Sequence, residues 1–321
     1  MLFRSLERFD NDLQNGETNN RLLFDIFFSR AFYAIEYQEY FLYGLNNSKD
    51  PGKLDYVGWY ELKSYYRRLN IMGRPEIFDL KHKTYELFHD YYCREFLWFS
   101  SIEQKDDFMS FFQRHSAGII KPTDKLGGRG IEIIRIEKDT DTNQIWSKVS
   151  NHLPFVLEEL IEQSHEMNIF YPHSVNTIRY NTFYHDGTLT RMQAAFRTGR
   201  GGSYVDNATS GGIYTLVDTE TGRILGPARS LKDELFETHP DTGTQFEGNS
   251  IPRWDELNKL IEKVVRVVPE QKQVGWDFAL SKNGWVIVEG NTHPALQAFD
   301  LNHGLRPLVI STFGKVVPIW H

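Results

Sequence analysis

Two acids and an amide in the last third of the chain are residue types that could bind a hard cation. Asp277, Glu289 and Asn291 lie in the stretch VGWDFALSKNGWVIVEGN, which predicts two short strands, 274–280 and 285–289, joined by a turn. Carboxylate and amide oxygens are ligands that Mg²⁺ prefers, and two opposed carboxylates repel each other unless a cation neutralises them. We interpret the stretch as a candidate magnesium site. The alternative is a solvated edge hairpin that carries two unrelated acids.

The length of the turn decides whether these acids face each other. A two-residue loop at the Asn-Gly pair leaves Asp277 and Glu289 on opposite faces of the hairpin. A three-residue loop, residues 282–284 with a left-handed glycine as a G1 bulge, sets Asp277 opposite Glu289 and puts Asn291 on the same face. Directly opposed side chains have Cβ atoms about 5 Å apart, which is close enough to share one cation. The metal hypothesis therefore predicts the three-residue loop.

A glycine-rich segment, IIKPTDKLGGRGI, joins two further predicted strands, 117–121 and 131–137. A Walker A loop needs Gly-Lys-Ser/Thr and a following helix, and a dinucleotide fingerprint also opens a helix, so neither fits. A glycine-rich hairpin tip can still lay backbone N–H groups along phosphates, with Lys121 as a point charge at the strand end. A tight turn without a ligand is the competing interpretation of Gly127, Gly128 and Gly130.

Other charged residues lie on predicted strands and helices. The buried strand 155–161, FVLEELI, carries Glu158 and Glu159 on opposite faces, so one of them faces the apolar side and needs a hydrogen-bond partner, such as a purine amine. Arg179 and Arg197 lie on two predicted strands, 177–184 and 190–197, which precede the glycine-rich loop TGRGGSYVDNATSGG. Lys81, His82 and Lys83 stand near the start of a helix, where cations oppose the helix dipole; this hints at function, although a solvated face explains most such runs.

The remaining features bound the class of protein. A chain of 321 residues can form two or three packed units, and a net charge of −7 without a basic run argues against a nucleic-acid partner. The single cysteine, Cys93, excludes an internal disulfide and a cysteine-based zinc site. The first residues lack the apolar core of a signal peptide, and the most apolar stretch, 21–45, contains charged residues that include Asp25, Arg30, Glu36 and Glu39, so we expect a cytoplasmic protein without a membrane span.

Residues 1–75 are predicted to be helical and rich in aromatic side chains. Apolar residues recur at spacings of three and four, which predicts one buried helix face and favours core packing over an aromatic sugar pocket. These residues are Leu23, Phe24, Phe27, Phe28, Ala31, Phe32 and Ile35.

The order of the motifs resembles the ATP-grasp superfamily from about residue 81 to the end. IIKPTDKLGGRGI, FVLEELIE, NATSGG and VEGN are most similar to its sugar-transfer-associated branch. The resemblance implies an α+β, ATP-grasp fold in which two subdomains, 76–163 and 164–321, clasp ATP behind a helical region, 1–75. The helical region replaces the small α/β unit usual in this superfamily; it could bind the acceptor, form a dimer or cover the cleft.

The resemblance also implies roles for single residues. For the phosphates of ATP these are Lys121 on the α- and β-phosphates, Lys83 (or Lys81) as the second phosphate lysine, and Gly127, Gly128 and Gly130 as the lid. For the nucleoside they are Glu158 at the adenine amine, Glu159 and Ile161 as backbone contacts, and Glu166 (or His165) at the ribose. Asp277, Glu289 and Asn291 match the ligands of two Mg²⁺ ions. Many ligases of the superfamily have an arginine where this chain has Gly275, so Arg179 or Arg197 must supply its charge.

The typical family reaction is carboxylate activation by ATP through an acylphosphate, which an amine then attacks. Arg197 would neutralise the transferring phosphoryl group. Arg179, Arg197 and the substrate loop would offer donors to the tetrahedral intermediate; the loop residues are Asn207, Gly211 and Gly212. His293 is a candidate base for the amine or a structural histidine. The branch suggests cell-surface polysaccharide assembly, joining an amino acid to a uronic acid or amino sugar. A kinase acting on a sugar hydroxyl, with His293 or Asp300 as base, and a nucleotide-binding scaffold are the alternatives.

Overall fold

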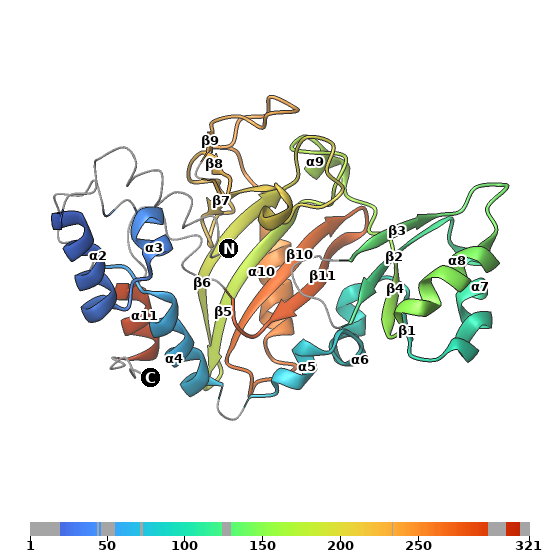
Figure 1. Ribbon diagram of the computed structural model, residues 1–321, viewed down its shortest axis with the longest axis horizontal. Coiled ribbons are helices and arrows are strands. Elements are labelled where there is room, and N and C mark those ends of the chain that lie inside the picture. The colour runs from blue at the N-terminus through green and yellow to red at the C-terminus, as the bar shows by residue number, and fades with distance from the viewer. Residues whose placement is uncertain are drawn as a thin grey trace. The chain divides into compact units, whose positions relative to one another are not determined.

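The computed structural model describes residues 20–43, 45, 55–70, 73–123, 130–232, 234–294 and 306–314 (Figure 1). The predicted lid residues Gly127 and Gly128, and Asp300, lie outside the described residues. The chain divides into two compact units, residues 1–73 with 293–321 and residues 74–292. The division into two ATP-grasp subdomains at residue 163 stays a prediction.

The first unit is helical, as the sequence predicts. Its helices are α2 (Asn20–Tyr33), α3 (Tyr37–Leu42), α4 (Trp59–Leu69) and α11 (Arg306–Phe313). The Glu39 carboxylate accepts the backbone N–H groups of Glu36 at 2.8 Å and Trp59 at 2.7 Å, so one buried acid caps the starts of two helices. Glu61, also buried, forms an ion pair with Arg306 at 2.6 Å, which fastens α11 to α4.

The predicted buried face of α2 is wrong. Phe24 and Phe27 are each 68% exposed and Phe32 is 64% exposed, whereas Leu22 and Tyr33 pack against the core of this unit. The helix carries apolar side chains around most of its circumference, so spacing alone could not identify the face that packs.

The second unit begins with two helices and a small sheet. Helices α5 (Pro75–Asp79) and α6 (Lys81–Tyr92) precede a four-stranded antiparallel sheet in the order β1-β4-β2-β3. Its elements are β1 (Phe96–Phe99), η2 (Ile102–Gln104), α7 (Lys105–Arg114), β2 (Ala117–Pro122), β3 (Glu132–Arg135), α8 (Thr142–Val149), η3 (Ser150–His152) and β4 (Phe155–Glu159). Phe108, Phe111 and Trp146 from α7 and α8 pack with Phe99 and Phe155, which explains the aromatic content of this region.

A seven-stranded antiparallel sheet forms the rest of the unit, in the order β11-β10-β5-β6-β7-β8-β9. Its elements are α9 (His165–Asn168), β5 (Thr177–His185), β6 (Thr188–Thr198), η4 (Ala208–Ser210), β7 (Ile213–Val217), β8 (Ala228–Arg229), β9 (Leu235–Phe236), α10 (Trp254–Val264), β10 (Gln273–Ser281) and β11 (Gly284–Asn291). Figure 1 shows α10 running behind these long strands. Because side chains alternate along a strand, one face carries the apolar core and the other is free for polar residues.

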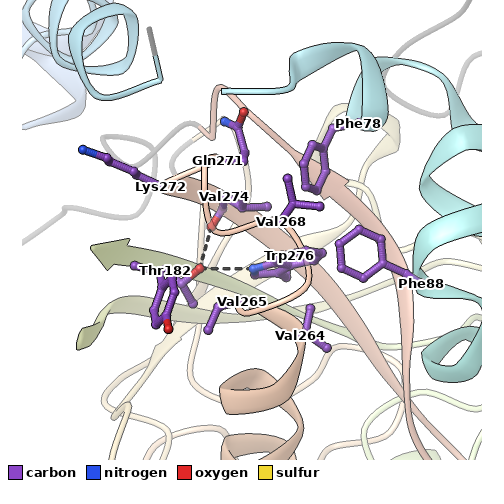
Figure 2. A pocket seen from close by; sticks show the side chains of 11 residues that line it. Phe78, Phe88, Thr182, Val264, Val265, Val268, Gln271, Lys272, Val274 and Trp276 are labelled. Carbon is purple, nitrogen blue, oxygen red and sulfur yellow. Dashed lines mark hydrogen bonds between the residues drawn. The ribbon is translucent and has the colours of Figure 1, made fainter. Parts of the chain in front are cut away.

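Trp276 anchors the apolar face of β10. In Figure 2 its indole lies beside the rings of Phe78 and Phe88, and Nε1 donates to Thr182 Oγ1 at 3.1 Å. The Thr182 hydroxyl in turn donates to the carbonyl of Val274 at 3.2 Å. The strand is thereby fixed one residue before Asp277, whose side chain must project from the opposite face.

Candidate active site

The β10–β11 hairpin has the pairing that the metal hypothesis requires. Asp277 lies opposite Glu289, and Gly275 lies opposite Asn291. The Asn291 amide donates to Glu289 Oε1 at 3.2 Å, so these two side chains share a face. The predicted opposition of Asp277 and Glu289 is confirmed.

The predicted route to that register is wrong. Ser281 pairs with Gly284, so Gly284 is a strand residue, and the extra residue is accommodated by a bulge at Val288 instead of in the loop. The Ser281 hydroxyl donates to the Gly284 carbonyl at 2.8 Å and accepts the N–H of Asn283 at 3.2 Å, which closes a two-residue turn. A bulge one residue before Glu289 then restores the pairing that the shorter turn would have lost.

Glycine is required between the two β11 candidates. A Cβ at Gly290 would lie 2.7 Å from a ring carbon of Phe78. The sequence Glu289-Gly-Asn291 thus lets the strand press on this ring while its two polar side chains turn to the other face.

Two arginines from neighbouring strands neutralise Asp277. Arg179 on β5 donates through Nε at 2.5 Å and through Nη2 at 3.0 Å, and Arg197 on β6 lies 2.9 Å from Oδ2. Burial by itself would raise the pKa of Asp277, but the two guanidinium groups outweigh it and lower the pKa to about 2. Both arginines that were predicted to replace the one missing at Gly275 therefore lie against Asp277, and their catalytic role stays a prediction.

Arg197 also contacts a residue that sequence reasoning missed. Its Nε and Nη2 donate to Thr177 Oγ1 at 3.0 and 2.9 Å, and Thr177 donates to the carboxylate of Asp206. Asp206 Oδ2 lies 3.7 Å from Arg197 Nε, and burial raises the pKa of Asp206 despite that charge. The signal in the sequence is the aspartate of VDNATSGG, directly before the predicted loop residue Asn207.

The pKa of Glu289 is shifted in the opposite direction to that of Asp277. Burial and then the charge of Asp277 raise its pKa above the ordinary 4.5, and among the described residues it forms no ion pair with a lysine or arginine. Its carboxylate and the Asn291 amide are hard oxygen donors that fit a divalent cation. No cluster of three or more His, Cys, Asp or Glu that could hold a metal occurs within the described ranges, so the candidate set consists of two acids and an amide.

A polar cavity in the second unit brings several predicted residues together. Lys121, Glu158, Glu289 and Asn291 line it with Phe78, Asp79, Lys81, Thr84, Tyr92, Phe96, Val288 and Gly290. Of the two candidate phosphate lysines, Lys81 lines this cavity, where its Nζ donates to the carbonyl of Pro122 at 3.3 Å. Lys83 is not among its described lining residues.

Glu158 lies in a buried ion triad. Lys121 Nζ is 2.7 Å from Oε1, and Arg94 donates to Oε2 through Nε at 2.9 Å and Nη2 at 2.7 Å. Burial favours a raised pKa, yet Lys121 and then Arg94 reverse it, so the pKa of Glu158 falls below its ordinary value. Sequence reasoning missed Arg94. The predicted contact of Glu158 with the adenine amine stays untested.

The other nucleotide candidates are spread around β4 and α9. The N–H of Glu159 donates to the Glu95 carbonyl at 2.9 Å, and Ile161 follows β4. His165 and Glu166 are both exposed on α9, so the structure brings neither to the cavity. Gly130 follows the predicted lid tip with φ +74°.

The predicted substrate loop is held by its own backbone. The N–H groups of Ser210 and Gly212 donate to the Asn207 carbonyl at 2.9 and 3.1 Å. A Cβ at Gly212 would lie 2.2 Å from the carbonyl oxygen of Asp206, so this close approach requires glycine, and Gly211 has φ +100°. His293 belongs to the first unit, where it packs edge-on against Tyr66 at 5.9 Å.

Comparisons with known proteins define the family. The family model described as sugar-transfer associated ATP-grasp matches residues 61–313, and the chain belongs to that family. The resemblance and the ATP-grasp fold predicted from the motifs are confirmed. No curated protein matches the chain. No helix in the described part of the chain is long and apolar enough to cross a membrane.

Solved structures with similarity to the chain are distant. They include the ATP-grasp ligase PsnB, complexed with a phosphomimetic variant of its minimal precursor, Mg and ADP, at 12% identity and TM-score 0.42, covering 80% of this chain and 61% of that one. D-alanyl-alanine synthetase A from Vibrio cholerae has 12% identity and TM-score 0.42, covering 73% and 58%. D-alanine–D-alanine ligase from Bacillus anthracis complexed with ATP has 13% identity and TM-score 0.40, covering 68% and 57%. The chain thus spans 57–61% of the length of these proteins.

Proposed function

We propose that this protein is an ATP-dependent carboxylate–amine ligase that acts through an acylphosphate. The single observation that carries the proposal is the cavity in which Lys81 and Lys121 lie with Glu289 and Asn291. Lysines are suitable partners for phosphates, and hard oxygen donors are suitable for the cation that accompanies a nucleotide. Membership of the sugar-transfer associated ATP-grasp family supports the same assignment.

In the proposed reaction, a substrate carboxylate oxygen attacks the terminal phosphorus of ATP, and ADP leaves. The nitrogen of an amine then attacks the acyl carbon, its proton is lost, and inorganic phosphate leaves as the amide forms. Lys121 and Lys81 would bind the nucleotide phosphates, and Arg197 and Arg179 would stabilise negative charge on the transferring group. Neither step requires a side-chain nucleophile.

Mg²⁺ would be held by Glu289, Asn291 and Asp277, and when bound it would neutralise phosphate charge. The adenine amine would contact Glu158, with backbone contacts from Glu159 and Ile161, and the ribose would contact Glu166 or His165. The substrate would contact the loop residues Asn207, Gly211 and Gly212. Lys81 replaces Lys83 as our choice for the second phosphate lysine, because it lines the cavity.

We infer from the family name that the acceptor is sugar-linked. We further propose that the protein acts in the cytoplasm on cell-surface polysaccharide precursors. An amino acid joined to a uronic acid or amino sugar would contain the required carboxylate and amine.

The test is an assay of ADP and phosphate release with Mg·ATP, uronic acids and amino acids, given singly and in pairs. We expect both products only with a carboxylate–amine pair, and hydroxylamine should trap the acylphosphate. Glu289→Gln should lose at least about 100-fold in rate while remaining folded, because the amide removes a charge that would bind the cation and that forms no ion pair with a described lysine or arginine. Glu256→Gln, at a side chain 52% exposed on α10, is the matched control. ADP release with one sugar and no free phosphate would instead identify a kinase.

A further inference from the structure

Arg94 makes several contacts besides its salt bridge with Glu158. Its side chain is 4% exposed, and two of its nitrogens donate to Glu158. The third, Nη1, donates to the carbonyl of Ile287 on β11 at 2.7 Å and to the carbonyl of Tyr92 at 3.2 Å. The guanidinium carbon also lies 4.5 Å from the centroid of the Tyr92 ring. Every guanidinium nitrogen therefore has an acceptor, and the group links β4 to β11.

Lys121 is held less firmly on the other side of the same carboxylate. Its side chain is 14% exposed, against 3% for Glu158, and its ammonium contacts Oε1 at 2.7 Å. Lys121 lines the cavity, which Arg94 does not. A lysine is a point charge on a flexible stem, whereas an arginine with fixed acceptors on two backbone carbonyls is not free to move. Of the two cations, Lys121 is the one that can turn toward a ligand.

A ligand phosphate that takes the Lys121 ammonium removes one of the two cations from Glu158. A buried carboxylate left without a cation is costly, and it would take up a proton instead. The second cation prevents this, because Arg94 pairs with the other carboxylate oxygen and does not depend on the cavity being empty.

We propose that Arg94 is a positioning residue that keeps Glu158 ionised and in place while Lys121 exchanges Glu158 for a nucleotide phosphate. The inference rests on the proposed nucleotide site. It adds to that site a residue that does not touch the nucleotide but decides whether nucleotide binding is coupled to a proton.

The charges that face Glu158 fix the sign of the expected pH dependence. Beside Lys121 and Arg94, these are Tyr92 and Lys81 of α6, Asp79 of α5 and Glu289 of β11, all on the cavity wall. Burial disfavours the carboxylate, and Lys121 and then Arg94, the two cations in direct contact with it, lower its pKa. Without Arg94, nucleotide binding at Lys121 would require Glu158 to gain a proton, and affinity would fall as pH rises.

The experiment measures the affinity of the intact protein for Mg·ADP by titration calorimetry between pH 7 and pH 9. The wild type should show an affinity that does not change with pH. Arg94→Met should bind more weakly, with affinity falling up to about tenfold for each pH unit and with uptake of up to about one proton, measured in buffers of different ionisation heat. Arg94→Met/Glu158→Gln should remove the pH dependence, because a neutral amide needs no counter-ion. Arg74→Met, in an exposed arginine–glutamate pair, is the control and should match the wild type.

Equal, pH-independent affinity in the wild type and Arg94→Met would overturn the inference, as would pH dependence that persists in the double variant. Arg94→Lys keeps a cation beside Glu158 and should bind without proton uptake; uptake in this variant would also overturn it, and this comparison remains available if Arg94→Met does not fold. A wild type that binds no Mg·ADP at any pH would refute the proposed function itself, which is a separate result.

Discussion

Asp277→Asn tests whether the ion pairs of Asp277 with Arg179 and Arg197 stabilise the native state. The wild-type carboxylate accepts hydrogen bonds from Arg179 and Arg197 and is 3% exposed. The variant keeps the size of the side chain but removes its charge, so two buried guanidinium groups lose their shared anion. We expect a less stable fold.

The size of the effect follows from the pKa of Asp277. The folded-state pKa is about 2 against an ordinary 3.8. At about 1.4 kcal/mol for each pKa unit, ionised Asp277 contributes about 2 kcal/mol to stability at pH 7. Because the folded pKa is depressed, this contribution is full well above pH 3.8 and is lost as pH falls toward 2; by pH 3 about half of it remains. The unpaired arginines add to the cost, since breaking a buried ion pair typically costs about 3–5 kcal/mol.

The assay is urea unfolding followed by tryptophan fluorescence at pH 7, 5, 4 and 3. The free energy of unfolding of Asp277→Asn should lie about 2–5 kcal/mol below that of the wild type at pH 7, and the difference should narrow by about 1 kcal/mol by pH 3. Asp186→Asn is the matched control, because its side chain is 85% exposed and its φ of +47° suits asparagine. An Asp277→Asn protein as stable as the wild type at pH 7, or a gap that stays constant to pH 3, would refute the pairing.

Two further perturbations test other parts of the fold. Burial raises the pKa of Glu39 to about 7, so the folded protein binds a proton there and should lose stability as pH rises from about 4.5 to about 7. Glu39→Gln should remove this dependence of the thermal unfolding midpoint on pH. An unchanged pH dependence in the variant would contradict the burial of that acid. Gly212→Ala should cost about 1–3 kcal/mol in urea unfolding, because its Cβ would lie 2.2 Å from the Asp206 carbonyl oxygen, whereas Gly226→Ala, with nothing within 4 Å, should be close to neutral. Equal stability of the two alanine variants would mean that the loop is not held as described.

The sequence predicted local patterns well and long-range pairings poorly. Strand alternation was enough to place Glu289 and Asn291 on one face, since that depends only on neighbouring residues. The turn was not predictable by the same rule, because the hydroxyl of Ser281 selects a two-residue loop and the bulge at Val288 then compensates for it. The pairing was therefore correct although the predicted loop was not.

Residues that meet across sequence separations of tens of residues could be suspected but not paired. Arg179 contacts Asp277 because β5 and β10 are neighbours in register, 98 residues apart in the chain, and no local pattern encodes that register. Arg94 contacts Glu158 across 64 residues for the same reason. The choice of Lys81 over Lys83 depends on which side of α6 faces the end of β2, and the local sequence does not encode that packing.

The balance of charge in the cavity bears on what a nucleotide must bring with it. Among the residues that the structure describes, Lys81 and Lys121 line it with the acids Asp79, Glu158 and Glu289, and Arg94 behind the wall brings the cations to three against three acids. Because these described charges cancel, they offer the phosphates of ATP no net positive charge, even if Lys121 turns from Glu158 toward them. The deficit lies beside Glu289, the acid without a described lysine or arginine partner, and that is where a divalent cation would complete the site. Nucleotide affinity should accordingly fall steeply when EDTA removes the divalent cation, and equal affinity with and without EDTA would show that the phosphates find their positive charge elsewhere.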